Sequence, residues 1–191
     1  MADNNIENRP NIEEDTQRGR YLTFTLAGST YGVAIRYVIE IVGVGRITKV
    51  PNTPAFIKGI TNLRGKIIPL VDVRLKFGRP EIPYTERTCV IVADVGGVDV
   101  GLIVDRVDDV IAIPDESIAA VPEGRVGFED RFIESVGDVD GKMLFIVDME
   151  VFVGPSAAET EYAPFPASGG AMAHEETAAP AAAPAANEND G

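Results

Sequence analysis

The feature that most constrains this chain is an internal repeat. The stretch "GKIIPLVDVRLKFG" (residues 65–78) returns as "GKMLFIVDMEVFVG" (residues 141–154). Each stretch opens with Gly-Lys, runs through apolar residues to a Val-Asp pair at the same offset, and closes on Gly. Near-continuous apolar runs bounded by glycine are typical of buried strands. The repeat therefore predicts two copies of one small β unit.

A second pair of similar stretches extends the repeat toward the N-terminus. "YGVAIRYVIEIV" (residues 31–42) resembles "VGLIVDRVDDVI" (residues 100–111), and the match aligns Val38 with Val107. Both pairs occur in the same order, at a spacing of roughly 70 to 76 residues, which is longer than solenoid repeats. We expect each unit to contain a hairpin, a loop, a buried strand and a capped turn. Because one such unit buries little surface alone, the two should pack together around a groove.

Strand signals dominate the rest of the repeated region. "YLTFTL" alternates apolar and polar residues, as a half-buried strand does. Gly96-Gly97 lies between two apolar runs and predicts a tight hairpin turn. Pro69 cannot donate to a β-ladder, so its strand is expected at a sheet edge or with a bulge. Many short strands with glycine-rich turns favour an all-β fold of small barrels.

Only short helices are predicted. Asp72 and Asp148 follow the two buried strands, and each is expected to cap one helical turn. Thr53 and Pro54 form a typical helix start before "AFIKGI". The stretch "DESIAAV" predicts another brief helix.

Composition limits the classes of partner. The formal net charge is −13, from 30 acidic and 17 basic residues. Nucleic acids and anionic membranes attract basic surfaces, so neither is expected as a main partner. The chain has one cysteine, and we expect no internal disulfide, no signal peptide and no membrane insertion. A soluble cytoplasmic protein is the resulting expectation.

Three segments follow from the composition along the chain. Residues 1–19 are polar and acidic and are expected to be disordered. Residues 20–153 hold the repeated units and are expected to form one functional module of two intertwined β-barrel subdomains. Residues 154–191 are rich in Ala and Pro and are expected to form a disordered tail.

Residues suited to catalysis are scarce. The one histidine, His174, lies in the expected tail, where it cannot be held against a nucleophile. Cys89 sits in a strand pattern and is expected to be a small buried hydrophobe. The carboxylates of "VDRVDD" leave open a carboxylate-dependent hydrolase, although a solvated strand face is the simpler interpretation. We expect no catalytic residue, no metal and no cofactor.

The stretch "NTPAFIKGITNLRGKIIP" is the strongest candidate for a binding site. Gly59 and Gly65 permit a positive φ angle, and Asn62 can bond the backbone of its own loop. Arg64 should project beside the following strand. Arginine is enriched among binding hot spots, but an exposed arginine of little energetic value explains the same pattern. The residues alone leave both interpretations open.

These stretches together resemble the CheW-like domain family of chemotaxis coupling proteins. The resemblance runs from about Tyr21 to Val153, and "TPAFIKGITNLRG" is its most specific phrase. It implies two five-stranded SH3-like β-barrels side by side and no catalysis. It also implies an adaptor that joins the cytoplasmic tips of chemoreceptors to the regulatory domain of the histidine kinase CheA.

The resemblance also implies site residues. Family positions implicated in receptor binding correspond to Val38, Glu40, Gly59, Arg64, Val107 and Val110, to which we add Asn62 as the residue that fixes the loop. The residues that bind the kinase are not assigned. Ala34 and Ile39 stand where relatives are often polar, and Ile39 is expected to add an apolar contact. Recruitment to membrane-associated receptor arrays and self-association in array rings follow as expectations. A coupling role in a twitching or second-messenger pathway is the alternative.

Overall fold

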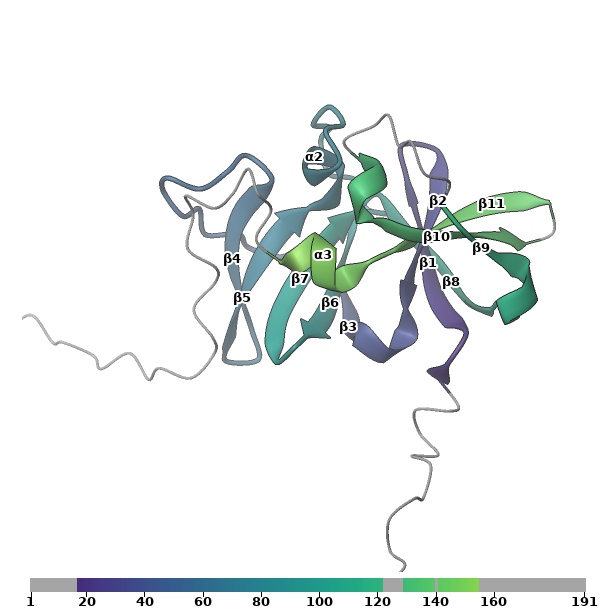
Figure 1. Cartoon of the computed structure of the whole chain (residues 1–191). Helices are drawn as coiled ribbons and strands as arrows, with labels where there is room; N and C mark the ends of the chain where they lie inside the picture. Colours follow the sequence, from purple (N-terminus) through teal and green to yellow (C-terminus); the bar gives the residue numbers. More distant parts are fainter. Residues whose placement is uncertain (1–16, 122–128, 140, 155–191) are drawn as a thin grey trace, which may run out of the picture.

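The computed structural model describes residues 17–121, 129–139 and 141–154, which form two β-sheets joined by short helices (Figure 1). The strands are β1 (Arg20–Leu26), β2 (Ser29–Ala34), β3 (Val38–Gly43), β4 (Ile57–Leu63), β5 (Lys66–Asp72), β6 (Cys89–Val95), β7 (Val98–Val104), β8 (Arg106–Ala112), β9 (Ile118–Ala120), β10 (Ile133–Val139) and β11 (Lys142–Val147). The helices are η1 (Ile35–Tyr37), α2 (Val73–Lys76), η2 (Asp115–Ser117), η3 (Glu129–Phe132) and α3 (Met149–Val153). Most of the two expected disordered segments, and His174 with them, lie outside the described residues.

The six-stranded sheet has the order β8-β1-β2-β11-β10-β9, and the five-stranded sheet has the order β3-β6-β7-β5-β4. This mostly-β arrangement of two sheets is consistent with the expected pair of SH3-like barrels. One detail differs from the expectation of five strands each. The three-residue strand β9 pairs with β10 and adds a sixth strand at one edge.

The two repeated units do not each form their own sheet, which corrects the simplest interpretation of the repeat. Strand β2 of the first unit pairs in parallel with β11 of the second, and β7 of the second pairs in parallel with β5 of the first. Gly32 faces Ile146 in one ladder, and Gly101 faces Leu70 in the other. These two pairs occupy matching positions of the repeat. The first hairpin of each unit therefore belongs to the sheet that contains the buried strand of the other unit. The two parallel pairings have the same register.

The strand that contains Pro69 is not an edge strand. β5 lies between β7 and β4, and the residue opposite Pro69 in β4 is Ile60. Parallel pairing with β7 begins only at Leu70, so the missing N–H of Pro69 interrupts no bond of that ladder. The register shift in the β4–β5 ladder falls at β4 residue Lys58, so the bulge is on the neighbouring strand.

The two predicted capped turns are confirmed. Asp72 Oδ1 accepts a hydrogen bond from Leu75 N at 3.1 Å at the start of α2, and Asp148 Oδ1 accepts one from Val151 N at 2.9 Å at the start of α3. The predicted turn at Gly96-Gly97 is confirmed as well, with both residues at positive φ between β6 and β7.

The helix predicted after Thr53 and Pro54 is wrong. Residues of "AFIKGI" belong mostly to β4, which begins at Ile57, and Thr53 Oγ1 donates to Val50 O within a turn. The pairing of β4 with β5 outweighs the local capping preference, because a full ladder satisfies more backbone groups than one short helix. The stretch "DESIAAV" is divided between the 3₁₀ turn η2 and strand β9.

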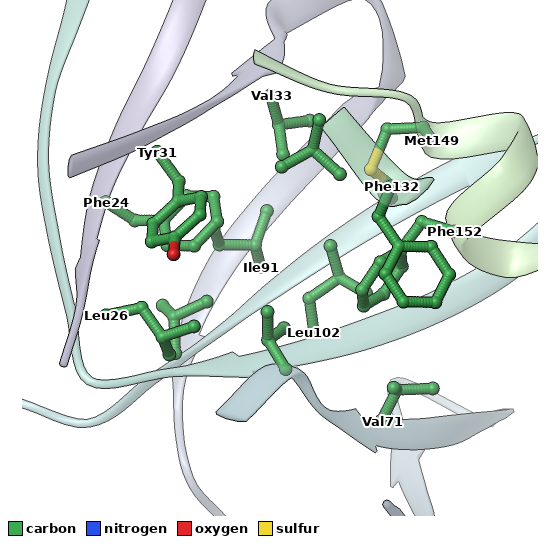
Figure 2. Packing of buried hydrophobic residues seen from close by; sticks show 14 of the residues in the cluster. Phe24, Leu26, Tyr31, Val33, Val71, Ile91, Leu102, Phe132, Met149 and Phe152 are labelled. Atoms are coloured by element: carbon green, nitrogen blue, oxygen red, sulfur yellow. The ribbon is translucent and has the colours of Figure 1, made fainter. Parts of the chain in front are cut away.

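One core cluster joins the two sheets. It contains Phe24 and Val33 from the six-stranded sheet and Ile91 and Leu102 from the five-stranded sheet, and Figure 2 shows their side chains converging. Aromatic rings extend the cluster toward α2 and α3, where Phe132 and Phe152 meet at a centroid distance of 5.3 Å. Because this core draws on both sheets, the two barrels form one packed body.

A buried lysine lies where the two units meet. Lys76 is 4% exposed, and its Nζ lies over the rings of Phe56, Phe132 and Phe152 at 4.6, 5.5 and 5.3 Å. Lys76 and Phe152 hold the same position in the two repeated phrases. A cation over aromatic faces is favourable, most of all where water is excluded.

Candidate functional site

The hairpin that joins β4 to β5 presents the predicted arginine at its tip. Arg64 and Gly65 both have positive φ angles, 53° and 88°, as a two-residue hairpin turn requires. Asn62 Oδ1 accepts a hydrogen bond from Gly65 N at 2.9 Å, which confirms that Asn62 fixes the loop. The Arg64 side chain is 79% exposed. The turn therefore holds the backbone and leaves the guanidinium accessible.

Arg64 forms an ion pair with a second predicted site residue. Its Nη2 lies 2.9 Å from Glu40 Oε2 on β3, and the Glu40 side chain is only 22% exposed. β3 and β4 are the two edge strands of the five-stranded sheet. The pair therefore spans the seam between the edges, and we call it the Arg64–Glu40 clasp. Exposed pairs of this kind contribute about 1 kcal/mol at most.

Exposed apolar side chains occur on the strands that carry Glu40 and flank the Arg64 turn. Ile39 and Ile41 of β3 are 51% and 44% exposed, and Ile67 of β5 is 58% exposed directly across the ladder from Asn62. An exposed isoleucine at position 39 agrees with the expectation of an added apolar contact. Ile41 is in register with Ile91 and Glu40 with Val92, so Ile41 and Glu40 lie on opposite faces of β3. The sequence pattern did not single out Ile41 or Ile67, because strand alternation does not show which face stays uncovered.

Gly59 has a structural part in the site. It is buried in β4 at φ 137°, and a Cβ atom there would lie 2.1 Å from Thr48 O. Thr48 and Ile60 exchange two backbone hydrogen bonds, each 2.8 Å long. The absence of a side chain at Gly59 therefore lets the segment before β4 pair with that strand.

The three predicted valines lie elsewhere on the two edges. Val38 on β3 pairs with Ala93, and Val107 on β8 is in register with Phe24. Both valines are half-buried and pack against the shared core. Val110, also on β8, is 38% exposed. The structure thus brings Glu40, Asn62 and Arg64 together at one end of the five-stranded sheet and places Val107 and Val110 at the edge of the other sheet.

The carboxylates of "VDRVDD" serve contacts within the fold. Asp105 receives two hydrogen bonds from Arg74, at 3.0 and 2.7 Å, and one from Ala27 N at 3.0 Å. Burial alone would raise the pKa of Asp105, but these hydrogen bonds lower it on balance. Asp108 pairs with Arg106 at 2.6 Å. These partners favour the structural interpretation over a hydrolase.

Residues 17–121, 129–139 and 141–154 contain no group of three or more His, Cys, Asp or Glu side chains that could hold a metal ion. No helix within the same ranges is long and apolar enough to span a membrane. Cys89 is half-buried rather than fully buried, and its Sγ donates to Arg87 O.

Two interlocked sheets, with the "VDRVDD" carboxylates engaged in contacts within the fold, are the arrangement of a scaffold class of protein rather than of an enzyme. The family model of the CheW-like domain matches residues 20–154. The chain is 41% identical to the chemotaxis protein CheW of Klebsiella aerogenes over 136 residues, which are 71% of this chain and 82% of that protein. It is 35% identical to the chemotaxis protein CheW of Rhizobium meliloti, over 71% of this chain and 88% of that one.

A solved structure gives the same result. The crystal structure of the scaffolding protein TtCheW from Thermoanaerobacter tengcongensis matches with a TM-score of 0.67 and 37% sequence identity, covering 71% of this chain and 92% of that one. The chain belongs to the CheW-like domain family. Members of this family are non-catalytic scaffold and coupling proteins of chemotaxis.

Proposed function

We propose that this chain couples chemoreceptors to the histidine kinase CheA, with the Arg64–Glu40 clasp as the centre of its receptor-binding surface. The observation that carries the proposal is the exposed guanidinium of Arg64 at the tip of a turn fixed by Asn62, with the exposed Ile67 side chain across the ladder from Asn62. A preformed turn that presents an arginine near an exposed apolar side chain suits a protein partner. The family membership supports the same role.

The partner's shape follows from the spread of the site residues. Receptor tips are expected to present an amphipathic helical hairpin, which docks by placing its apolar face against exposed apolar residues. Contact with both Val38 and Val107 would make such a hairpin span both sheets. The kinase would then use other surfaces of the two barrels. With a net charge of −13, recruitment to membrane-associated arrays would proceed through the receptor rather than through anionic lipid.

The test is co-sedimentation of the full chain with receptor-containing membranes and CheA. Arg64→Asp should lower the amount of bound chain at least tenfold if the arginine is a buried hot spot, since such residues contribute about 2 kcal/mol or more. Arg87→Asp is the matched control, because Arg87 is also exposed and lies before β6. Undiminished binding of Arg64→Asp, or an equal loss in both variants, would contradict the assigned surface.

A coupling role in a twitching or second-messenger pathway remains the alternative prediction. The same scaffold and the same surface would serve either pathway. Identification of the receptors and of the kinase that co-purify with the full chain separates the two, because each pathway has its own receptor and kinase set.

A further inference from the structure

A cavity of about 380 Å³ opens beside the Arg64–Glu40 clasp. Its apolar walls are Val42, Leu63, Ile68, Leu70, Val90 and Val92, contributed by β3, β4, β5 and β6. Four of these residues belong to a core cluster of the five-stranded sheet that is separate from the shared core. The cavity thus enters the barrel through the seam between β3 and β4. Its size is at the lower end of the range for ligand pockets, about 300–1,000 Å³, which suits individual side chains.

The mouth of the cavity is polar and basic. Arg46, Thr61 and Asn62 line it. Arg46 is exposed and has no carboxylate partner among the residues that the structure describes, and exposed Lys49 follows it closely in sequence. In a chain of net charge −13, a basic rim around an apolar cavity selects an apolar group with acidic neighbours.

The chain itself contains a segment in which aromatic residues have acidic neighbours. Residues 159–166 read "ETEYAPFP" and combine two glutamates with Tyr162 and Phe165. No other Phe, Tyr or Trp follows Phe152 in the sequence. The two prolines restrict the backbone of this segment and lower the entropy cost of holding it against a surface.

The segment is long enough to reach the seam. The described chain ends at Gly154, directly after α3, whose buried residues pack in the shared core on the other face of β6 from Val90 and Val92. Phe165 follows Gly154 by eleven residues, which span up to about 36–40 Å when extended. A domain of this size has a radius of gyration of about 14 Å. The tether also keeps the segment at a local concentration in the millimolar range, so a weak site suffices.

We propose that residues 159–166 dock into this cavity in the same molecule, with the Phe165 ring between the walls of β5 and β6 and Glu159 and Glu161 facing Arg46. The docked segment covers the seam beside Asn62 and the clasp. This inference goes beyond the proposed function and does not depend on it.

The test is methyl NMR spectroscopy of the full chain. We expect nuclear Overhauser contacts between the Phe165 ring and the methyl groups of Leu70, Val90 and Val92. Phe165→Ala should remove these contacts and move the methyl resonances of the cavity walls, while leaving those of Val33 and Val147 in place. Met172→Ala is the matched control in the same tail and should change neither set.

Two further experiments test whether the segment comes from the same molecule and whether Arg46 contributes to its binding. The contacts should keep their intensity on tenfold dilution, and a loss on dilution would instead assign the segment to a second copy and overturn the proposal. Arg46→Glu should weaken the contacts severalfold, whereas Arg87→Glu should not. Absence of Phe165 contacts to any cavity methyl in the wild-type chain, or contacts to another surface, also overturns the proposal.

Discussion

The two halves of the molecule share a backbone plan and differ in the side chains that bridge it. The turn arginine and its partner, Arg64 and Glu40, form an ion pair in the five-stranded sheet. The matching positions of the repeat are Asp140 and Asp109, both acidic, and Asp109 Oδ1 accepts a hydrogen bond from Val110 N instead. The repeat therefore specifies the backbone of the scaffold, and the proposed receptor surface lies where the side chains of one half differ from those of the other.

A second comparison concerns the junctions between the sheets. Arg74 and Asp105 form a bidentate pair whose side chains are 14% and 24% exposed. The matching positions of the repeat carry the charges reversed, as Glu150 and Arg36. There the two groups meet only through Tyr37, whose hydroxyl lies 3.2 Å from Arg36 Nη2 and 3.4 Å from Glu150 Oε1. One junction is closed by a direct pair, and the other surrounds a polar cavity of about 210 Å³.

The largest expected effect comes from Gly59→Ala. The added Cβ would meet backbone atom Thr48 O, and φ 137° is unfavourable for any other residue. We expect the free energy of unfolding to fall by about 2–4 kcal/mol, measured by urea denaturation. Gly43→Ala is the control, because a Cβ there meets nothing within 4 Å. Equal losses in both variants would contradict this explanation of Gly59.

Breaking the two junctions separately should show which one stabilises the fold more. Arg74→Ala removes two of the three hydrogen bonds that the partly buried Asp105 carboxylate accepts, and should lower the free energy of unfolding by about 2 kcal/mol. Arg36→Ala removes a looser contact and should lower the same quantity by less than about 1 kcal/mol. Urea denaturation of both variants gives the comparison, and the reverse order would refute it.

The Arg74–Asp105 pair also predicts a pH dependence. Because the pKa of Asp105 is lowered in the folded protein, its contribution is present above the unfolded pKa of about 3.9. It is lost as the pH falls through the folded pKa. The free energy of unfolding should therefore fall less steeply below about pH 4 in Arg74→Ala than in the wild-type chain. If the free energy of unfolding fell equally steeply with decreasing pH in both proteins, that result would argue against a lowered pKa of Asp105.

The smallest expected effect on stability belongs to the turn between β4 and β5. Arg64→Ala removes an exposed ion pair and should change the free energy of unfolding by less than about 1 kcal/mol. Thermal or urea denaturation checks this. A larger loss would mean that the Arg64–Glu40 clasp holds the seam closed as a structural element.

The sequence predicted local features better than pairings. The turns at Gly96-Gly97 and Asn62–Gly65 depend on residues a few positions apart, and both were predicted. The exchange of hairpins between the sheets was not predicted in its pairings, because a strand pattern shows which residues are buried but not which strand lies beside them. The helix expected at Thr53 failed for the same reason, since the partner strand β5 decides the conformation there.

For the candidate site, the sequence likewise predicted the local turn but not the contacts between strands. Arg64 could be placed at a turn from its glycine and asparagine neighbours. The ion pair with Glu40 joins two strand edges that meet only when the sheet curls, and no local pattern indicates that approach. The cavity beside the clasp had no sequence signal either, because its wall residues look like any other strand core.

The most direct measurement is receptor co-sedimentation of the charge-swapped chain Arg64→Glu with Glu40→Arg. The swap keeps an ion pair across the seam and should leave the free energy of unfolding near the wild-type value. If Arg64 contacts the receptor itself, the swapped chain should stay at least tenfold weaker in binding than the wild-type chain. Recovery of wild-type binding would show that the pair acts only by holding the seam, and would contradict a receptor surface centred on Arg64.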